Sequence, residues 1–194
     1  MLWQKVLAIF LFVWIIFTDS KLHVLQSIFG IVGIFLLFLG IVGRMYATLY
    51  IGGMKNEGND GHSFINDGAY SICRNPLYLF SFIAFVGLLF IKGQILLIIF
   101  GIMGYLIIYR ITILNEEVFL SNKFGDRYRE FLKTTPRFFP KFSLFKYSDK
   151  VEFRPLFLHK EFRRAFVWLF IALFIYLISV LQDYGVIKII LNVY

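Results

Sequence analysis

Residues 77–113 read LYLFSFIAFVGLLFIKGQILLIIFGIMGYLIIYRITI, which is two apolar runs on either side of a lysine and a glycine. The runs extend from about Leu77 to Ile91 and from about Gln94 to Ile113. At about 1.5 Å per helical residue, each run is long enough, or nearly so, to cross a hydrocarbon core about 30 Å thick. Because Lys92-Gly93 is typical of a tight turn, the stretch predicts a helical hairpin within a membrane.

Three further apolar runs bring the predicted number of transmembrane helices to five. They cover about Leu2 to Phe17, Leu22 to Gly43 and Ala165 to Leu181. The hydrophobic fraction of the chain is 59%, against about 45–50% in an average soluble domain. We therefore expect an all-α integral membrane protein that folds as a single domain over residues 1–194. Its expected parts are an N-terminal hairpin (1–43), a central region (44–140) and a C-terminal segment (141–194).

The two ends of the chain need separate interpretations. The first run is short and has Lys5 near its start, so a signal peptide is the alternative to a transmembrane helix. The residues that follow, Thr18-Asp19-Ser20-Lys21, match a cleavage site poorly, and we expect a retained anchor. The tail from Val186 to Tyr194 is too short to span and is expected at the membrane interface.

A stripe of glycines marks the second apolar run. Gly30, Gly33, Gly40 and Gly43 are spaced three, seven and three residues apart. Small residues at such intervals let a neighbouring membrane helix approach closely. Chance is the alternative interpretation, because glycine is common in membrane helices. We expect a helix–helix contact along the stripe.

Basic residues are concentrated in one part of the chain. Residues 110–164 contain thirteen Lys and Arg against seven Asp and Glu. The positive-inside rule places this segment in the cytoplasm. Alternation then puts the N-terminus and residues 44–76 in the cytoplasm and the C-terminus outside. The formal charge of +8 lies mostly beside apolar runs, where anionic lipid headgroups are better partners than nucleic acid.

Polar signatures lie in two places where apolar runs meet basic loops. The first comprises Gly68-Ala69-Tyr70 and Arg74-Asn75-Pro76-Leu77-Tyr78, and the second comprises Asn115-Glu116-Glu117, Phe124-Gly125-Asp126-Arg127-Tyr128 and Pro136-Arg137-Phe138-Phe139-Pro140. Charged side chains so close to lipid are costly, so their clustering predicts a functional site. Asn75-Pro76 also predicts a helix start, since Asn is a favoured N-cap and Pro suits the first turn. The free N–H groups of that helix start suit a carboxylate ligand.

The second basic loop contains further helical patterns. Tyr105, Tyr109 and Thr112 share one helical face with Glu116. An apolar stripe at four-, four- and three-residue spacing comprises Leu120, Phe124, Tyr128 and Phe131. It predicts an interfacial or docked helix that is broken or bent near Gly125. The mixture of basic and aromatic residues in 141–147 predicts another membrane-surface segment.

Several common chemistries are not indicated. The sequence has no Gly-x-Gly-x-x-Gly after a strand and no phosphate-binding Gly-x-x-x-x-Gly-Lys-Ser/Thr. His23, His62 and His159 are far apart and lack metal-ligand spacing, so no metal is expected. Cys73 is the sole cysteine, which excludes an intrachain disulfide, and we interpret it as an inert structural thiol.

The two polar signatures together resemble the integral-membrane methyltransferases related to isoprenylcysteine carboxyl methyltransferase and to phospholipid N-methyltransferases. Those proteins carry Gly-Pro-Tyr, then Arg-His/Asn-Pro-x-Tyr, a Glu-Glu pair after a helical hairpin, and a Phe-Gly-x-x-Tyr to Pro-Arg-Phe-x-Pro run. Residues 44–140 match that order, with Ala69 in place of Pro and Asn75 in place of the His of eukaryotic members. With Asn at that position, no imidazole is available for proton transfer.

The resemblance implies binding of S-adenosylmethionine at the cytosolic face and release of S-adenosylhomocysteine. By analogy, residues 62–70 cover the adenosine, the Arg74-Asn75 region holds the methionine end, and the glutamates meet the amino group or ribose hydroxyls. The cofactor-binding residues it implies are His62, Phe64, Ile65, Gly68, Tyr70, Arg74, Asn75, Pro76, Tyr78, Tyr109, Glu116 and Glu117. The catalytic residues it implies are Arg74, Asn75, Glu117 and Arg137.

The implied partners are membrane lipids and a lipophilic acceptor, methylated on oxygen, nitrogen or sulfur. No dedicated base is evident, which weakly favours oxygen or sulfur. A non-catalytic membrane scaffold or lipid-binding protein is the alternative function, and a small transporter ranks last because the runs hold almost no polar residues at mid-depth. Arg74 alone is typical of a membrane anchor, and Glu116-Glu117 of a solvated helix end. Arg137 is as consistent with a lipid-phosphate contact or a loop anchor as with a contact to the acceptor. The sequence leaves the oligomeric state open.

Overall fold

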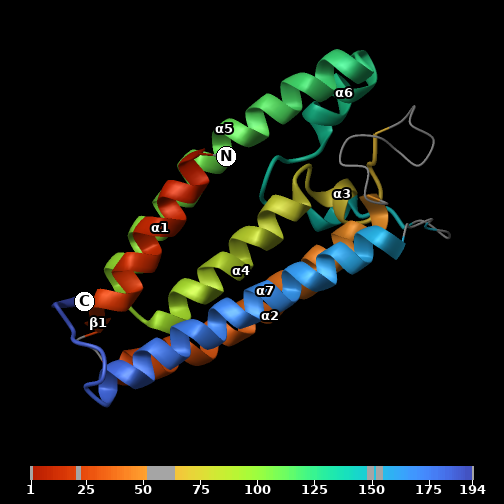
Figure 1. Cartoon of the computed structure of the whole chain (residues 1–194). Coiled ribbons are helices and arrows are strands. Elements are labelled where there is room, and N and C mark those ends of the chain that lie inside the picture. Colours follow the sequence, from red (N-terminus) through yellow and green to blue (C-terminus); the bar gives the residue numbers. More distant parts are fainter. Residues whose placement is uncertain (1, 21–22, 52–63, 148–150, 152–154, 194) are drawn as a thin grey trace. The chain divides into compact units, whose positions relative to one another are not determined.

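A computed structural model describes residues 2–20, 23–51, 64–147, 151 and 155–193. The described part is almost entirely helical (Figure 1). Its elements in chain order are α1 (Leu2–Phe17), β1 (Thr18–Ser20), α2 (His23–Ile51), α3 (Ala69–Ile72), α4 (Pro76–Lys92), α5 (Ile95–Phe124), α6 (Asp126–Thr134), the 3-10 helix η1 (Phe142–Leu144), α7 (Pro155–Asp183) and β2 (Leu191–Val193).

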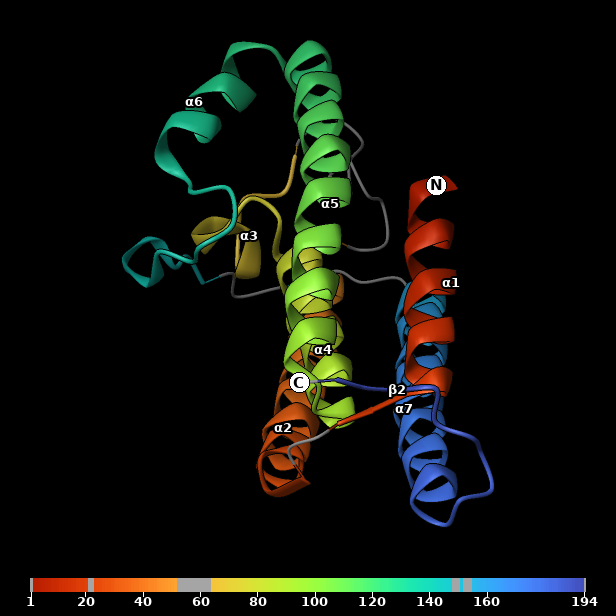
Figure 2. The ribbon, with the colours of Figure 1, turned by 90° about the vertical axis from the view of Figure 1, so that its left-hand side faces the viewer.

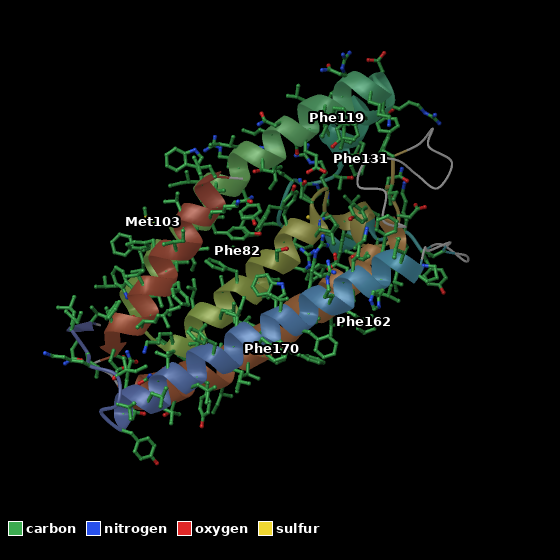
Figure 3. All side chains as sticks on the ribbon, in the orientation of Figure 1. Phe82, Met103, Phe119, Phe131, Phe162 and Phe170 are labelled. Atoms are coloured by element: carbon green, nitrogen blue, oxygen red, sulfur yellow. The ribbon has the colours of Figure 1, made fainter. Side chains whose placement is uncertain are left out.

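Three helices are long and apolar enough to cross a membrane, namely the Gln26–Tyr50 part of α2, α5 and α7. Their surfaces carry many exposed apolar side chains, among them Met103 and Phe170 (Figure 3). Such surfaces need lipid as solvent, so the protein is an integral membrane protein. The helices α1 and α4 are apolar but shorter, with 16 and 17 residues. The expected number of about five spans is therefore not confirmed.

The long helices continue beyond the apolar runs that predict them. α2 extends past Gly43 to Ile51, so Arg44 lies inside a helix rather than at the start of a loop. α5 extends to Phe124, so Glu116-Glu117 is also helical. α7 begins at Pro155, ten residues before the predicted start. Hydropathy marks the lipid-facing part of a helix, whereas polar residues with good helix propensity extend it without a signal of that kind.

The chain divides into two compact units. Unit 1 comprises Met1–Gly40, Phe82–Arg110 and Phe166–Tyr194, and unit 2 comprises Ile41–Ser81 and Ile111–Ala165. The unit boundaries fall inside helices. The expected division of the chain at residues 43 and 140 stays a prediction.

Unit 1 contains a buried polar cluster around the turn between α4 and α5. Lys92 is fully buried, and its Nζ donates to Gln182 Oε1 at 2.6 Å and lies 3.5 Å from Asp19 Oδ1. Gln182 Nε2 in turn donates to the carbonyl oxygen of Ile16 at 2.8 Å. A buried charge needs such partners, so the cluster ties the ends of α1, α4 and α7 together. The Lys92-Gly93 turn predicted from the sequence is present, and Gly93 has a φ of 72°.

The C-terminal tail pairs with the segment that follows α1. β2 pairs in parallel with β1, with Thr18 opposite Leu191 and Ser20 opposite Val193 (Figure 2). The pairing satisfies the backbone groups that follow α1. Sequence periodicity gives no signal for it, because three-residue strands are too short to show alternation.

The glycine stripe of α2 faces α4, as the spacing predicts. A Cβ on Gly33 would lie 2.7 Å from the carbonyl oxygen of Gly87, and one on Gly40 would lie 2.5 Å from the backbone nitrogen of Ala84. In unit 2, a Cβ on Gly43 would enter the ring of Phe80. Gly30 is different, since nothing lies within 4 Å of a Cβ there. The close helix contact is confirmed at three of the four glycines.

This difference gives a matched pair of substitutions. We expect Gly40→Ala to lower the thermal midpoint of unfolding in detergent, because the backbone of α4 must move away. Gly30→Ala should be neutral or slightly stabilising, by at most about 1 kcal/mol from helix propensity. Equal midpoints for the two variants would contradict the close contact at Gly40.

Candidate functional site

Glu117 is the centre of a charged cluster in unit 2. Its side chain is only 8% exposed, and it lies on α5 between two arginines from other parts of the chain. Arg137 donates from Nε to Oε1 at 3.1 Å and from Nη2 to Oε2 at 2.8 Å. Arg74 Nη1 lies 3.5 Å from the same Oε1. The two distant polar signatures therefore meet at one carboxylate.

Backbone contacts hold the two arginine-bearing segments side by side. The Arg74 N–H donates to the carbonyl oxygen of Pro136 at 2.9 Å, and Asn75 Nδ2 donates to the carbonyl oxygen of Arg137 at 3.1 Å. Further along, the Lys141 N–H donates to the carbonyl oxygen of Ile72 at 2.9 Å. These bonds fix both arginines relative to α4, which begins at Pro76 as predicted.

The second glutamate has a different partner. Tyr78, in the first turn of α4, donates its hydroxyl hydrogen bond to Glu116 Oε2 at 2.8 Å. Asn75 immediately precedes the helix, and its carbonyl oxygen accepts the N–H of Leu79 at 3.0 Å, as expected at a helix start. The start of α4 therefore contributes to both glutamate contacts.

Aromatic side chains from three segments pack beside the charged cluster. Phe64 contacts Phe124, Tyr128 and Phe131, with ring centroids 5.7, 5.1 and 5.1 Å away (Figure 3 labels Phe131). The break at Gly125, where φ is 60°, sets α6 at an angle to α5 and brings these rings together. The sequence left open whether the apolar face of Phe124, Tyr128 and Phe131 lies at the membrane interface or docks on the protein. Its contacts to Phe64 correspond to docking.

The turn before α3 is held by a glycine that no other residue replaces easily. Gly68 has a φ of 55°, and a Cβ there would enter the ring of Tyr50. Ala69 and Tyr70, with Ala47 from α2, form a small buried core against which Ile65 packs. The Pro-to-Ala difference from the family pattern at Ala69 leaves this turn formed.

Two buried polar atoms of the cluster lack a hydrogen-bond partner among the described residues. They are Arg74 Nε and the hydroxyl of Tyr70. Burial, and next the charge of Glu116, raise the pKa of Tyr70 well above its ordinary value. Burial, and next Glu117, likewise raise the pKa of Tyr128. Both phenols therefore remain protonated and can donate hydrogen bonds, but neither can serve as a base at neutral pH.

Arg137 is held in its charged form. Its hydrogen bond to Glu117 raises its pKa further above the ordinary value. Its side chain is 47% exposed, so a ligand can reach it without displacing the glutamate.

Cys73 is buried next to the cluster, where its Sγ donates to the carbonyl oxygen of Phe138 at 3.3 Å. Burial raises the pKa of Cys73 to about 11. Below the ordinary cysteine pKa of about 8.5, the thiol is protonated in both the folded and the unfolded chain, and its burial contributes fully to the stability of the fold. This contribution decreases as pH rises from there toward the folded-state pKa of about 11.

We therefore expect Cys73 to resist alkylation by iodoacetamide at pH 8 and to react fully after denaturation. In the folded protein, the reaction should accelerate only toward pH 11, because the thiolate is the reactive form. Mass spectrometry of the alkylated chain measures both. Rapid modification of the folded protein at pH 8 would contradict the buried environment.

Sequence reasoning did not single out a second ion cluster in unit 2. Arg44 of α2 donates to both carboxylate oxygens of Glu161 of α7, at 3.1 Å to Oε1 and 3.0 Å to Oε2. It also donates to the carbonyl oxygen of Leu77 at 3.2 Å and to Ser81. Arg164 reaches the same glutamate. The available signal was Arg44 directly after one apolar run and Glu161 shortly before another, because charges so close to lipid need partners.

The remaining predicted site residues divide into three groups. Arg74 and Arg137 pair with Glu117, and Asn75 bonds to the backbone of Arg137. Pro76 and Tyr78 lie in the first turn of α4, where Tyr78 bonds to Glu116 of α5. Phe64, Ile65, Gly68 and Tyr70 belong to the same unit. Tyr109 belongs to unit 1, where it stacks on Tyr105 with centroids 4.0 Å apart, and His62 lies outside the described residues.

The arrangement suits a small zwitterionic or anionic ligand with an apolar part. Arginine forks bind carboxylates, glutamates bind ammonium groups and hydroxyls, and aromatic faces attract cations.

The comparisons with known proteins define the class. The chain belongs to the phospholipid methyltransferase family, whose model matches residues 22–127. It is 33% identical over 115 residues to the nickel-cobalt-cadmium resistance protein NccN of Alcaligenes xylosoxydans xylosoxydans, which covers 59% of this chain and 51% of that protein. It is 32% identical over 108 residues to the cobalt-zinc-cadmium resistance protein CzcN of Cupriavidus metallidurans, covering 56% and 47%. The chain thus matches about half the length of these relatives, and no solved structure is significantly similar to it.

Proposed function

We propose that the protein is an S-adenosylmethionine-dependent methyltransferase whose acceptor is a membrane lipid or a lipidated molecule. Membership of the phospholipid methyltransferase family supports the reaction class. The observation that carries the assignment to this site is Glu117 between Arg74 and Arg137, which joins the two signature segments. Arg74 Nε and the Tyr70 hydroxyl, which have no hydrogen-bond partner in the described part of the chain, fit a ligand with a carboxylate and further acceptors.

Each part of the cluster has a distinct role in this proposal. The cofactor, when bound, supplies an electrophilic methyl group on a sulfonium. Arg74 binds the carboxylate of its methionine part, with Asn75 and Arg137 held beside it by the Asn75–Arg137 hydrogen bond. Glu116, held by Tyr78, accepts hydrogen bonds from the amino group or the ribose. Phe64 and Tyr128 supply aromatic surface for the adenosine or the sulfonium.

Catalysis in this proposal is mainly a matter of position. An in-line displacement requires nucleophile, methyl and sulfur to be aligned, and fixed geometry supplies much of the acceleration. The raised pKa of Tyr70 and of Tyr128 excludes them as bases at neutral pH. An acceptor that is already anionic, a carboxylate or a thiolate, therefore needs least help. In this proposal Glu117 positions both arginines. Arg137 is the more exposed of the two arginines, so the acceptor would enter the site on its side.

The orientation follows from the charge distribution. Residues 110–164 carry a net charge of +6, so we place the site at the cytosolic face, with the N-terminus inside and the C-terminus outside. The water-soluble cofactor would then enter from the cytosol and the acceptor from the bilayer.

The names of the two relatives concern metal resistance, and that role belongs to them. Within the described ranges of this chain, no three His, Cys, Asp or Glu side chains gather as metal ligands do. A non-catalytic scaffold is the second candidate, and it gives no role to a buried carboxylate shared by two arginines beside unpartnered polar atoms.

The direct test is incubation of membranes containing the protein with isotopically labelled S-adenosylmethionine, followed by mass spectrometry of the extracted lipids and membrane proteins. We expect a labelled product that is absent from control membranes. If no label enters any membrane component while the purified protein still binds the cofactor, the acceptor assignment is wrong. If the cofactor is not bound either, the scaffold is the better function.

A further inference from the structure

Four of the five aromatic side chains in residues 138–147 are exposed. Phe139, Phe142 and Tyr147 are 84%, 75% and 77% exposed. Phe145 is exposed as well. Large aromatic side chains gathered on a short segment mark a surface that contacts either another molecule or a membrane.

The backbone of this segment is anchored, so the exposure follows from fixed geometry. The Lys141 N–H bonds to Ile72, as described above, and Lys146 pairs at both of its backbone groups. Its carbonyl oxygen accepts the N–H of Gly68 at 3.0 Å, and its N–H donates to Ser71 Oγ at 3.0 Å. Since the backbone groups of Lys141 and Lys146 face residues 68–72, the two lysine side chains are directed outward.

The charge of the segment selects among partners. Residues 136–147 contain Arg137, Lys141 and Lys146 and no Asp or Glu, and both lysines are exposed. Exposed lysines among aromatic rings match the headgroup region of an anionic leaflet, where rings sit between water and acyl chains. A second copy of the same segment would bring like charges together. The membrane surface is therefore the favoured occupant.

We propose that residues 138–147 form a lipid-binding surface that inserts Phe139, Phe142 and Tyr147 into the interface of a leaflet and binds anionic phospholipid headgroups through Lys141 and Lys146. The partner is a phosphodiester lipid of net negative charge. This surface is separate from the proposed methyl-transfer chemistry, and its existence does not depend on that activity.

The test uses a nitroxide label on Phe142→Cys in the full chain, reconstituted in phosphatidylcholine vesicles with or without phosphatidylglycerol. Because Cys73 is buried, the unsubstituted protein serves as the background control. The measured quantity is the ratio of the label's accessibility to oxygen to its accessibility to a water-soluble nickel complex. We expect this ratio to be several-fold higher at residue 142 than for the same label at Glu130→Cys, on the exposed face of α6. Phosphatidylglycerol should deepen the label at residue 142.

A second variant separates the electrostatic part from simple burial. Lys141→Gln combined with Lys146→Gln should remove most of the effect of phosphatidylglycerol while the label at residue 142 stays shielded from nickel in both lipids. Equal nickel accessibility at residues 142 and 130 would overturn the proposal. So would a label depth that does not respond to phosphatidylglycerol, or dipolar coupling between labels of two chains, which would assign the surface to a second copy.

Discussion

Glu117→Gln is expected to lower the yield of labelled product by at least about 10²-fold, because displacement of a positioning group by about 1 Å has an effect of that size. The carboxamide retains the shape of the side chain but removes the charge that both arginines share. Arg137 loses its bidentate contact, and Arg74 loses its ion pair. The measurement is the initial rate of label transfer by purified protein in vesicles.

The matched control is Glu130→Gln, which removes a carboxylate from the exposed face of α6 and should leave the rate unchanged. Thermal unfolding of both variants shows whether Glu117→Gln is folded. A folded Glu117→Gln protein with the rate of the unsubstituted protein would remove Glu117 from the site.

Glu161→Ala is expected to destabilise the protein by about 3–5 kcal/mol, the usual cost when one partner of a buried ion pair is removed. Arg44 is the group left without compensation, because Glu161 accepts three of its hydrogen bonds and is itself buried. At about 2–4 °C per kcal/mol for a chain of this size, the thermal midpoint in detergent should fall by roughly 6–20 °C.

An exposed ion pair in the same unit provides the control. Arg129 and Asp126 are 3.0 Å apart on the surface of α6, so Asp126→Ala should change stability by no more than about 1 kcal/mol. The double variant Arg44→Met with Glu161→Met should recover most of the loss, since no charge remains buried. Equal midpoints for Glu161→Ala and Asp126→Ala would show that the buried pair does not hold α2 to α7.

The parts of the fold that follow from periodicity were predictable, and those that follow from tertiary contacts were not. Apolar runs predicted the α4–α5 hairpin, and glycine spacing predicted the contact of α2 with α4. The same runs placed the ends of α2 and α5 too early and the start of α7 too late, because a polar helix extension leaves no hydropathy signal. The parallel pairing of β1 with β2 depends on residues 173 positions apart, for example Thr18 and Leu191, and no local pattern encodes it.

For the candidate site, residue types and their order were readable from the sequence, but pairings were not. Arg74, Glu117 and Arg137 could be named because charges beside lipid are costly and the segments resemble a known family. In the structure Glu117 pairs with both arginines, whereas Glu116 pairs with Tyr78. These pairings depend on which face of α5 turns toward α4, and the sequence does not show that. Arg44 was missed because it looked like a charge at a helix end, and Glu161 was missed because it lies before the predicted run, which begins at Ala165.

The most direct measurement is isothermal titration of S-adenosylmethionine into the purified protein in detergent, since the whole account depends on a cofactor site in the cluster of unit 2. We expect saturable binding of one cofactor per chain, displaced by S-adenosylhomocysteine, lost in Arg74→Met and retained in Arg129→Met. Absence of binding by the folded protein, or binding that Arg74→Met leaves intact, would contradict the account.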